Sequence, residues 1–301
     1  MRCLCLVPLL GTLACGPGAP PTSPVDAASG VHAVNYPLQY FAQRIAGEHL
    51  EVRFLAPPDV DPAFWSPRDE DILALQSAEL ILLNGATYAK WIDLVTVPLE
   101  RTVVTSAAFE GELLELPATA THSHGESGSH AHVGIDFNTW LDPTLARQQA
   151  ASVLAALVDH LPDHAKELRA NAAALDEDLA SLDTAYRELS AGTDAPLLLA
   201  SHPVYGYLAA RYGWDVRSLL WEPEGMPSEA EWEAFDAIVS QHSARWMLYE
   251  DTPAPEIAAR LREDFGIETV VLRPCGNRPA EGDYLTEMRA GLERLRNVFQ
   301  P

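Results

Sequence analysis

The feature that most constrains the fold is an alternation of strand patterns and amphipathic helix patterns, interrupted once by a helical stretch. Four strand patterns precede residue 143 and four follow residue 192, at 31–36, 51–55, 80–83, 101–105, 196–200, 215–220, 245–249 and 268–272. Such alternation is typical of mainly parallel sheets with helices on both faces. The helical stretch predicts two helices, 144–161 and 162–189, the second roughly 40 Å long at ~1.5 Å per residue.

These patterns predict an α/β protein with two lobes, each a mainly parallel sheet flanked by helices, joined by one long rigid helix. We place the N-terminal lobe at 31–143, the helical linker at 144–192 and the C-terminal lobe at 193–301. Ser66 is expected to act as the N-cap of the helix that begins at Pro67. Ligands of open α/β sheets bind beyond the carboxyl ends of the strands, so residues that follow strands are the first candidates for a site.

The N-terminal region reads as an export signal followed by a tether. Residues 1–15 combine a basic residue, a short apolar run and Ala14 before Cys15, which resembles a bacterial lipobox with Cys15 as the lipidation site. Ordinary secretion without acylation is the alternative. Residues 16–30 are rich in Pro, Gly, Ala and Ser and predict a flexible tether. We therefore expect an extracytoplasmic protein, either a membrane-tethered lipoprotein or a periplasmic form.

The net charge of the chain limits the kinds of molecule it can bind. Asp and Glu number 43 against 20 Lys and Arg, a formal net charge of −23. A surplus this negative repels phosphate backbones, so nucleic acid is excluded as a partner. It suits a protein that handles cations, although a solvated acidic surface accounts for most of it.

Histidines cluster in one segment. Residues 121–133 (THSHGESGSHAHV) hold four of the ten histidines, His122, His124, His130 and His132. Imidazole is a good ligand for Zn²⁺ and its neighbours in the transition series, and Gly and Ser between the histidines predict a mobile loop that collects metal. The alternative is a solvated loop without a metal.

Three further candidates follow strands of the C-terminal lobe. His202 comes after the strand at 196–200, Glu222 after 215–220 and Glu250 after 245–249. Together they would supply nitrogen and oxygen ligands suited to Zn²⁺ or Mn²⁺. Neither a phosphate-binding glycine loop nor a catalytic motif occurs, so we expect a binding protein and not an enzyme.

At this point the chain resembles the zinc/manganese substrate-binding proteins of bacterial ABC importers. The resemblance covers nearly all of the chain after residue 30 and rests on VNYPLQYFAQRIAG, PPDVDPAFWSPRDEDILALQSAELILLNGATYAKWID, TWLDP, SHPVYGYLAARYG and GDYLTEMRAGLERL. It implies two lobes bridged by a rigid helix, and a histidine-rich loop at 121–133. Its implied partners are an ABC permease with its ATPase, and the membrane through an N-terminal lipid anchor. It also implies cleft-lining residues Asp61, Trp65, Asn138, Trp140 and Arg273.

The departures from this family matter as much as the matches. Its members usually hold the metal with three histidines and an acidic residue, but the corresponding positions here are Ala63, Asn138, His202 and Arg273. Alanine has no ligand atom and guanidinium is a permanent cation. Either the metal has moved to His202, Glu222 and Glu250, helped by the loop histidines, or metal binding is lost.

We expect extracytoplasmic capture of a divalent transition metal, Zn²⁺ first and Mn²⁺ second, and its delivery to an ABC permease. Arg273 would then pair with a carboxylate and orient it. Two alternatives stay open on the same scaffold. One is a receptor for a small anion, held by Arg273 and His202, and the other is an adhesin.

Overall fold

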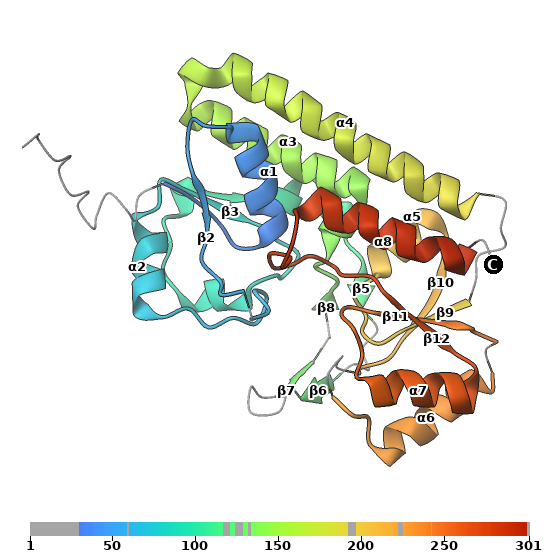
Figure 1. Cartoon of the computed structure of the whole chain (residues 1–301). Coiled ribbons are helices and arrows are strands. Elements are labelled where there is room, and N and C mark those ends of the chain that lie inside the picture. The colour runs from blue at the N-terminus through green and yellow to red at the C-terminus, as the bar shows by residue number, and fades with distance from the viewer. Residues whose placement is uncertain are drawn as a thin grey trace, which may run out of the picture.

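The computed structural model describes residues 30–58, 60–116, 121–123, 129–131, 134–191, 197–221, 225–241 and 243–299, and for 121–123 and 129–131 the backbone alone. The described residues form two sheet-containing lobes beneath a pair of long helices (Figure 1). Residues 1–29, with the predicted signal, Cys15 and most of the tether, lie outside the described residues.

The N-terminal lobe is built on a parallel sheet in the order β2-β1-β3-β4, and the predicted strands are confirmed. Their bounds are β1 Val31–Ala33, β2 Val52–Phe54, β3 Leu80–Leu83 and β4 Thr102–Val104. Helix α1 (Tyr36–Ala46) follows β1 because the Asn35 side chain accepts from the Leu38 amide at 3.2 Å and Pro37 occupies its first turn. Gly47 ends it with a φ of 61°, a conformation that glycine adopts without strain.

Helix α2 (Asp69–Ser77) begins later than the sequence predicted. The N-cap is Arg68, and the prediction of Ser66 is wrong. The carboxylate of Asp71 accepts the Arg68 amide at 2.9 Å and the Arg68 Nε at 3.0 Å. Because this acidic side chain satisfies the first-turn donor, the helix starts beside it and Ser66 precedes it in extended chain.

The C-terminal lobe repeats the plan with a parallel sheet in the order β10-β9-β11-β12. Its strands are β9 Leu197–Ala200, β10 Asp215–Ser218, β11 Trp246–Tyr249 and β12 Glu268–Val271. The helices of this half are α5 Gly206–Tyr212, α6 Glu229–Val239, α7 Pro255–Phe265 and α8 Tyr284–Phe299. A separate apolar core packs α6 and α7 on this sheet through an aromatic group of Trp221, Trp232, Phe235 and Phe265.

Two long helices connect the lobes. Helix α3 (Pro143–His160) passes through a 3-10 turn at Pro162–His164 into α4 (Ala165–Ser190), and the two lie side by side (Figure 1). Helix α4 contacts α1 of the N-terminal lobe and α5 and α8 of the C-terminal lobe. Ion pairs fasten it on both sides: Arg44 lies 2.9 Å from Asp178, and Arg211 lies 3.0 Å from Asp183. The prediction of a long helix that runs beside both lobes is confirmed.

The histidine-rich segment, predicted as a mobile loop, includes two short paired strands. Strands β6 (Thr121–Ser123) and β7 (Ser129–Ala131) pair antiparallel, with His122 opposite His130 in the register. A second ribbon pairs β5 (Glu115–Leu116) with β8 (Gly134–Ile135). His124 and His132 lie outside the described residues.

None of the helices in the described ranges combines the length and the apolar character that crossing a bilayer requires.

Candidate metal centre

Residues that follow strands β9, β11 and β12 meet at one edge of the C-terminal sheet. His202 lies two residues beyond β9, Glu250 directly beyond β11 and Arg273 two residues beyond β12. The ladder continues past the strands, with the Ser201 amide donating to Leu248 at 2.9 Å and the Leu272 amide donating to Tyr249 at 2.8 Å. The parallel sheet therefore carries these side chains to a common rim, as predicted from the strand ends.

The central observation is a histidine beside a carboxylate. His202 is 5% exposed, and its Nδ1 lies 3.9 Å from Glu250 Oε1 and 3.3 Å from the Trp221 carbonyl. A tetrahedral zinc with bonds of about 2.0–2.2 Å separates its nitrogen and oxygen ligands by roughly 3.4 Å. The pair is therefore within about half an ångström of shared coordination. In a second arrangement, Nδ1 donates to Trp221 and the lone pair lies on Nε2, with Glu250 orienting the ring.

The phenol of Tyr205 lies close enough to Glu250 to feel its charge. It is buried and donates to the Leu272 carbonyl at 2.8 Å. Burial and, secondarily, the negative charge of Glu250 raise the pKa of Tyr205 well above its ordinary value. The hydroxyl therefore stays a neutral donor, and β9 and β12 stay tied together beneath the rim.

Arg273 has carboxylates on two sides. Its Nη2 donates to Asp251 Oδ1 at 2.6 Å, and its Nη1 lies 3.8 Å from Glu287 Oε1. Burial opposes ionisation of Asp251, but hydrogen bonds from Thr252 and Arg273 outweigh it and lower the pKa of Asp251. The positive charge of Arg273 is therefore balanced by Asp251 and Glu287. Because Asp251 follows Glu250, this pairing is the one expected of an arginine that orients the segment carrying Glu250.

The N-terminal positions at which the family resemblance implies histidines offer no comparable ligand. Ala63 and Asn138 are buried, at 3% and 6% exposure. The amide nitrogen of the Asn138 side chain and its backbone N–H both donate to Asp136 Oδ1, at 3.0 and 2.9 Å. The Ala63 amide donates to Asp61 at 2.9 Å. These contacts shape two turns and do not assemble a metal site.

A buried polar network, which sequence reasoning missed, positions the turn at 136–139. Asn84 Oδ1 accepts from Asn35 at 3.1 Å and from Gln149 at 3.0 Å, and Asn84 Nδ2 donates to the Phe137 carbonyl at 3.0 Å. Gln149 also donates to Thr105 at 3.0 Å. The strand ends of β1, β3 and β4 are thereby joined to α3 and to the turn. The only available signal was that polar residues come one or two positions after three strands.

Asp136 is the most perturbed carboxyl group in this turn. It is 1% exposed, and its Oδ2 has no hydrogen-bond partner among the described residues. Burial raises the pKa of Asp136 to about 7, although the two hydrogen bonds from Asn138 act in the opposite direction. Oδ2 faces Gly206 at the start of α5, where an added Cβ would lie only 2.5 Å from it. Glycine is thus required for this close approach.

Of the two tryptophans predicted to line the cleft, Trp140 lies where the lobes meet. Trp140 is 1% exposed and donates from Nε1 to the Pro274 carbonyl at 2.7 Å, while its own carbonyl accepts from Tyr284 at 2.7 Å. An added Cβ at Gly276 would meet the Trp140 ring at 3.4 Å. Trp65 is 8% exposed and packs edge-on against Trp91. The cleft-lining role of these residues and of Asp61 stays a prediction.

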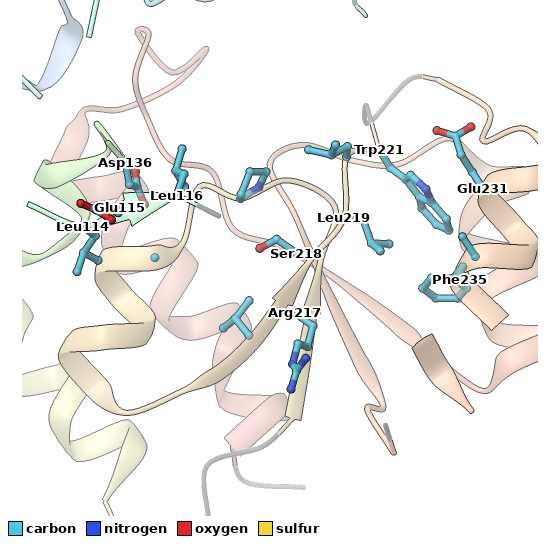
Figure 2. A pocket seen from close by; sticks show the side chains of 15 residues that line it. Leu114, Glu115, Leu116, Asp136, Arg217, Ser218, Leu219, Trp221, Glu231 and Phe235 are labelled. Atoms are coloured by element: carbon cyan, nitrogen blue, oxygen red, sulfur yellow. The ribbon is translucent and has the colours of Figure 1, made fainter. Parts of the chain in front are cut away.

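A cavity of about 690 Å³ lies beside the rim. Figure 2 shows Leu114, Glu115, Leu116 and Asp136 on one side, Trp221, Glu231 and Phe235 on the other, and Ser218 and Leu219 between them. Pro203, next to His202, also lines it. The cavity lies between the β5–β8 ribbon, which leads into the histidine-rich segment, and the end of β10, which precedes Glu222. Residues 222–224 lie outside the described residues, so the place of Glu222 stays a prediction.

Comparison with known proteins gives one family and consistent neighbours. The family model of ZnuA, described as zinc-uptake complex component A, periplasmic, matches residues 31–298. The zinc-binding lipoprotein AdcA of Streptococcus pneumoniae is 25% identical over 273 residues, 87% of this chain but 54% of AdcA. This chain therefore spans about half the length of that relative. The high-affinity zinc uptake system protein ZnuA of Bacillus subtilis is 25% identical over 294 residues, 94% of this chain and 92% of that protein.

Solved structures agree on the fold. The Zn(II)-bound ZnuA-like domain of Streptococcus pneumoniae AdcA superposes with a TM-score of 0.75 at 23% identity, covering 91% of this chain and 99% of that domain. The Bacillus subtilis metal-dependent lipoprotein YcdH gives a TM-score of 0.75 at 23% identity, covering 89% and 98%.

Proposed function

The chain belongs to the family of ZnuA, the periplasmic component A of zinc-uptake complexes, and from this premise we propose that it captures Zn²⁺ outside the cytoplasm. It would deliver the ion to an ABC permease and its ATPase. The observation that carries the metal-binding part is the buried His202 beside Glu250 at the carboxyl edge of a parallel sheet. Zn²⁺ is favoured over Mn²⁺ because imidazole is a better ligand for zinc. Such capture is reversible ligand exchange, and no covalent chemistry is required of the chain.

The proposed capture site lies on the C-terminal lobe alone. His202 and Glu250 supply a nitrogen and an oxygen donor, and Glu222 is the further ligand from the neighbouring strand end. The histidines 122, 124, 130 and 132 would collect the ion first and raise its local concentration. Arg273 holds Asp251 and thereby orients the segment that carries Glu250.

Binding should produce small movements. Direct hydrogen bonds join the lobes, from Trp140 to Pro274 at 2.7 Å and from the Tyr36 amide to Gly276 at 3.0 Å. Asn277 adds a bond to the Pro57 carbonyl at 2.6 Å. With α4 beside both lobes, this fastening opposes a wide hinge.

We propose membrane tethering through acylated Cys15, with residues 16–30 as the spacer. Metabolic labelling with a fatty-acid analogue tests this directly. Labelled full-length protein that becomes unlabelled in Cys15→Ser supports the anchor, whereas a soluble, unlabelled protein exported with its signal removed supports the periplasmic form instead.

The test of function is equilibrium dialysis with elemental analysis on the folded protein, with the variants His202→Ala, Glu250→Ala and Glu250→Gln. We expect His202→Ala to weaken the tightest zinc site at least ~100-fold, and Glu250→Ala to weaken it ~10–100-fold or more. His160→Ala is the matched control because its ring faces a carboxylate, Glu79, at 3.2 Å in the other lobe. No bound Zn²⁺ or Mn²⁺ at micromolar concentration refutes the function. Unchanged affinity in both His202→Ala and Glu250→Ala refutes this site.

The alternative hypothesis, a receptor for a small anion, requires Arg273 to contact the anion. An anion receptor needs an available guanidinium, but Arg273 already donates to Asp251 at 2.6 Å and lies near Glu287. Its charge is therefore largely matched within the protein, which disfavours anion binding. Arg273→Gln should lower zinc affinity modestly through loss of orientation. An anion receptor would instead lose all ligand binding in that variant.

A further inference from the structure

A second group of potential metal ligands lies away from the rim. Among the described residues, His49, His164 and Glu167 are the group whose metal-ligating atoms all fall within 4.8 Å of one another. His49 Nε2 lies 2.6 Å from Glu167 Oε2, and the rings of His49 and His164 stack with centroids 3.9 Å apart and an interplanar angle of 27°. His202, in contrast, belongs to the sheet of the other lobe.

The loop that carries His49 is held in place by hydrogen bonds. The Gln43 side chain donates to the carbonyls of Gly47, at 2.8 Å, and Leu50, at 3.1 Å. Asn171 on α4 donates to the Ile45 carbonyl at 3.1 Å. These bonds fix the end of α1 against α4, so His49 approaches His164 with little backbone freedom. The backbone of the first donor is therefore held in place before any ion arrives.

The other two donors share one face at the start of α4. His164 ends the 3-10 turn, with its amide donating to Leu161 at 3.0 Å, and Glu167 lies three residues further on in the first turn of the helix. Residues at this spacing are neighbours on a helix surface. His164 is half-buried and Glu167 exposed, so an ion bound here keeps contact with water.

We propose that His49, His164 and Glu167 form a second site for a divalent transition ion of the Zn²⁺ class, separate from the site at His202. Two imidazole nitrogens and one carboxylate oxygen are a donor set that Zn²⁺ accepts, with water in the fourth position. On binding, the ion takes the place of the hydrogen bond between His49 and Glu167, whose 2.6 Å contact opens to about 3.4 Å, and the stacked rings of His49 and His164 turn so that the ion lies in the plane of both. The bound ion clamps the α1–β2 loop to the inter-lobe helix α4.

This inference does not depend on the proposed function, because none of its ligands belongs to the rim. Its experiment uses the full chain with zinc chloride as the probe. Native mass spectrometry counts ions bound by the wild type, by the double variant His49→Ala/His164→Ala, by Glu167→Gln and by His160→Ala. His160→Ala is the matched control. His160 lies on α3 of the same helical pair, and its imidazole faces one carboxylate, that of Glu79. Circular dichroism confirms that each variant is folded.

We expect the double variant to bind one zinc ion fewer than the wild type, and Glu167→Gln to weaken that same site at least ~10-fold. His160→Ala should retain the ion, and so should His202→Ala, which tests the rim instead. Zinc anomalous diffraction should place a peak within ~2.2 Å of His49 Nε2. An unchanged zinc count and affinity in the double variant, or diffraction peaks at other sites only, overturns the proposal. Loss of zinc from His202→Ala alone would leave the rim site standing and this one refuted.

Discussion

The carboxyl group of Asp136 should make the stability of this protein depend on pH in a direction opposite to that of most acidic residues. Burial raises the pKa of Asp136 to about 7 from an ordinary value of 3.8. A raised pKa in the folded state means that folding favours the protonated acid. The stabilisation is complete below the ordinary pKa and is lost as the pH rises through about 7.

The magnitude follows from the proton count. Between about pH 5 and pH 6 the folded state holds nearly one proton more than the unfolded state at this residue, and about half a proton more at pH 7. The free energy of unfolding therefore falls by about 1.4 kcal/mol per pH unit, or roughly 2–3 kcal/mol from pH 5 to pH 8. Asp136→Asn removes the titration and keeps an oxygen that accepts from Asn138. We expect the variant to gain roughly 2–3 kcal/mol relative to the wild type over this interval.

Urea denaturation at pH 5 and pH 8 measures this difference, and the comparison with the wild type cancels the effects of the other charges. Asp183→Asn is the control. Burial opposes ionisation of Asp183, but hydrogen bonds from Arg211, Arg187 and Tyr212 outweigh it and lower its pKa. That variant should lose stability by the same amount at both pH values. A constant difference between Asp136→Asn and the wild type, within about 0.5 kcal/mol, would show that the carboxyl is not held protonated.

The remaining predictions concern packing, the polar network and metal capture. Gly206→Ala should cost about 1–3 kcal/mol in urea denaturation, because its Cβ would lie 2.5 Å from Asp136 Oδ2, whereas Gly111→Ala, with open space around it, should be nearly neutral. Asn84→Ala should cost about 2–4 kcal/mol in the same assay by leaving buried donors of Asn35 and Gln149 unpaired. Deleting residues 121–132 should slow zinc capture in stopped-flow competition and lower the stoichiometry, and an unchanged rate would exclude the segment from capture.

The fold followed from local patterns because each strand and helix carries its own signal. Runs such as Leu80–Leu83 and Trp246–Tyr249 are apolar because both faces of a parallel sheet are covered, and the structure has strands there. The residues at which helices begin were harder to predict from the sequence. At α2 the carboxylate of Asp71 decides where the helix starts, and that depends on side-chain geometry that a Ser-Pro pair in the sequence does not reveal.

The candidate site was only partly predictable. Strand ends place His202 and Glu250 together because β9 and β11 are neighbours, although the sequence does not state the strand order. No pattern in the sequence indicated that Asp136 would be buried with a raised pKa, because that depends on the close approach of Gly206. The same holds for His49 and His164, which are 115 positions apart and meet only through the packing of α1 on α4.

The positions of the proposed metal ligands determine which contacts hold the two lobes together. A metal site with ligands from both lobes would let the ion itself join them. Here Ala63 and Asn138 supply no such ligand, and the proposed donors His202 and Glu250 belong to one sheet. Cohesion must therefore come from the protein, through Trp140 with Pro274, Tyr36 with Gly276, and α4 packed against both halves. A lobe interface that does not need the ion leaves metal release free of any requirement to separate the lobes.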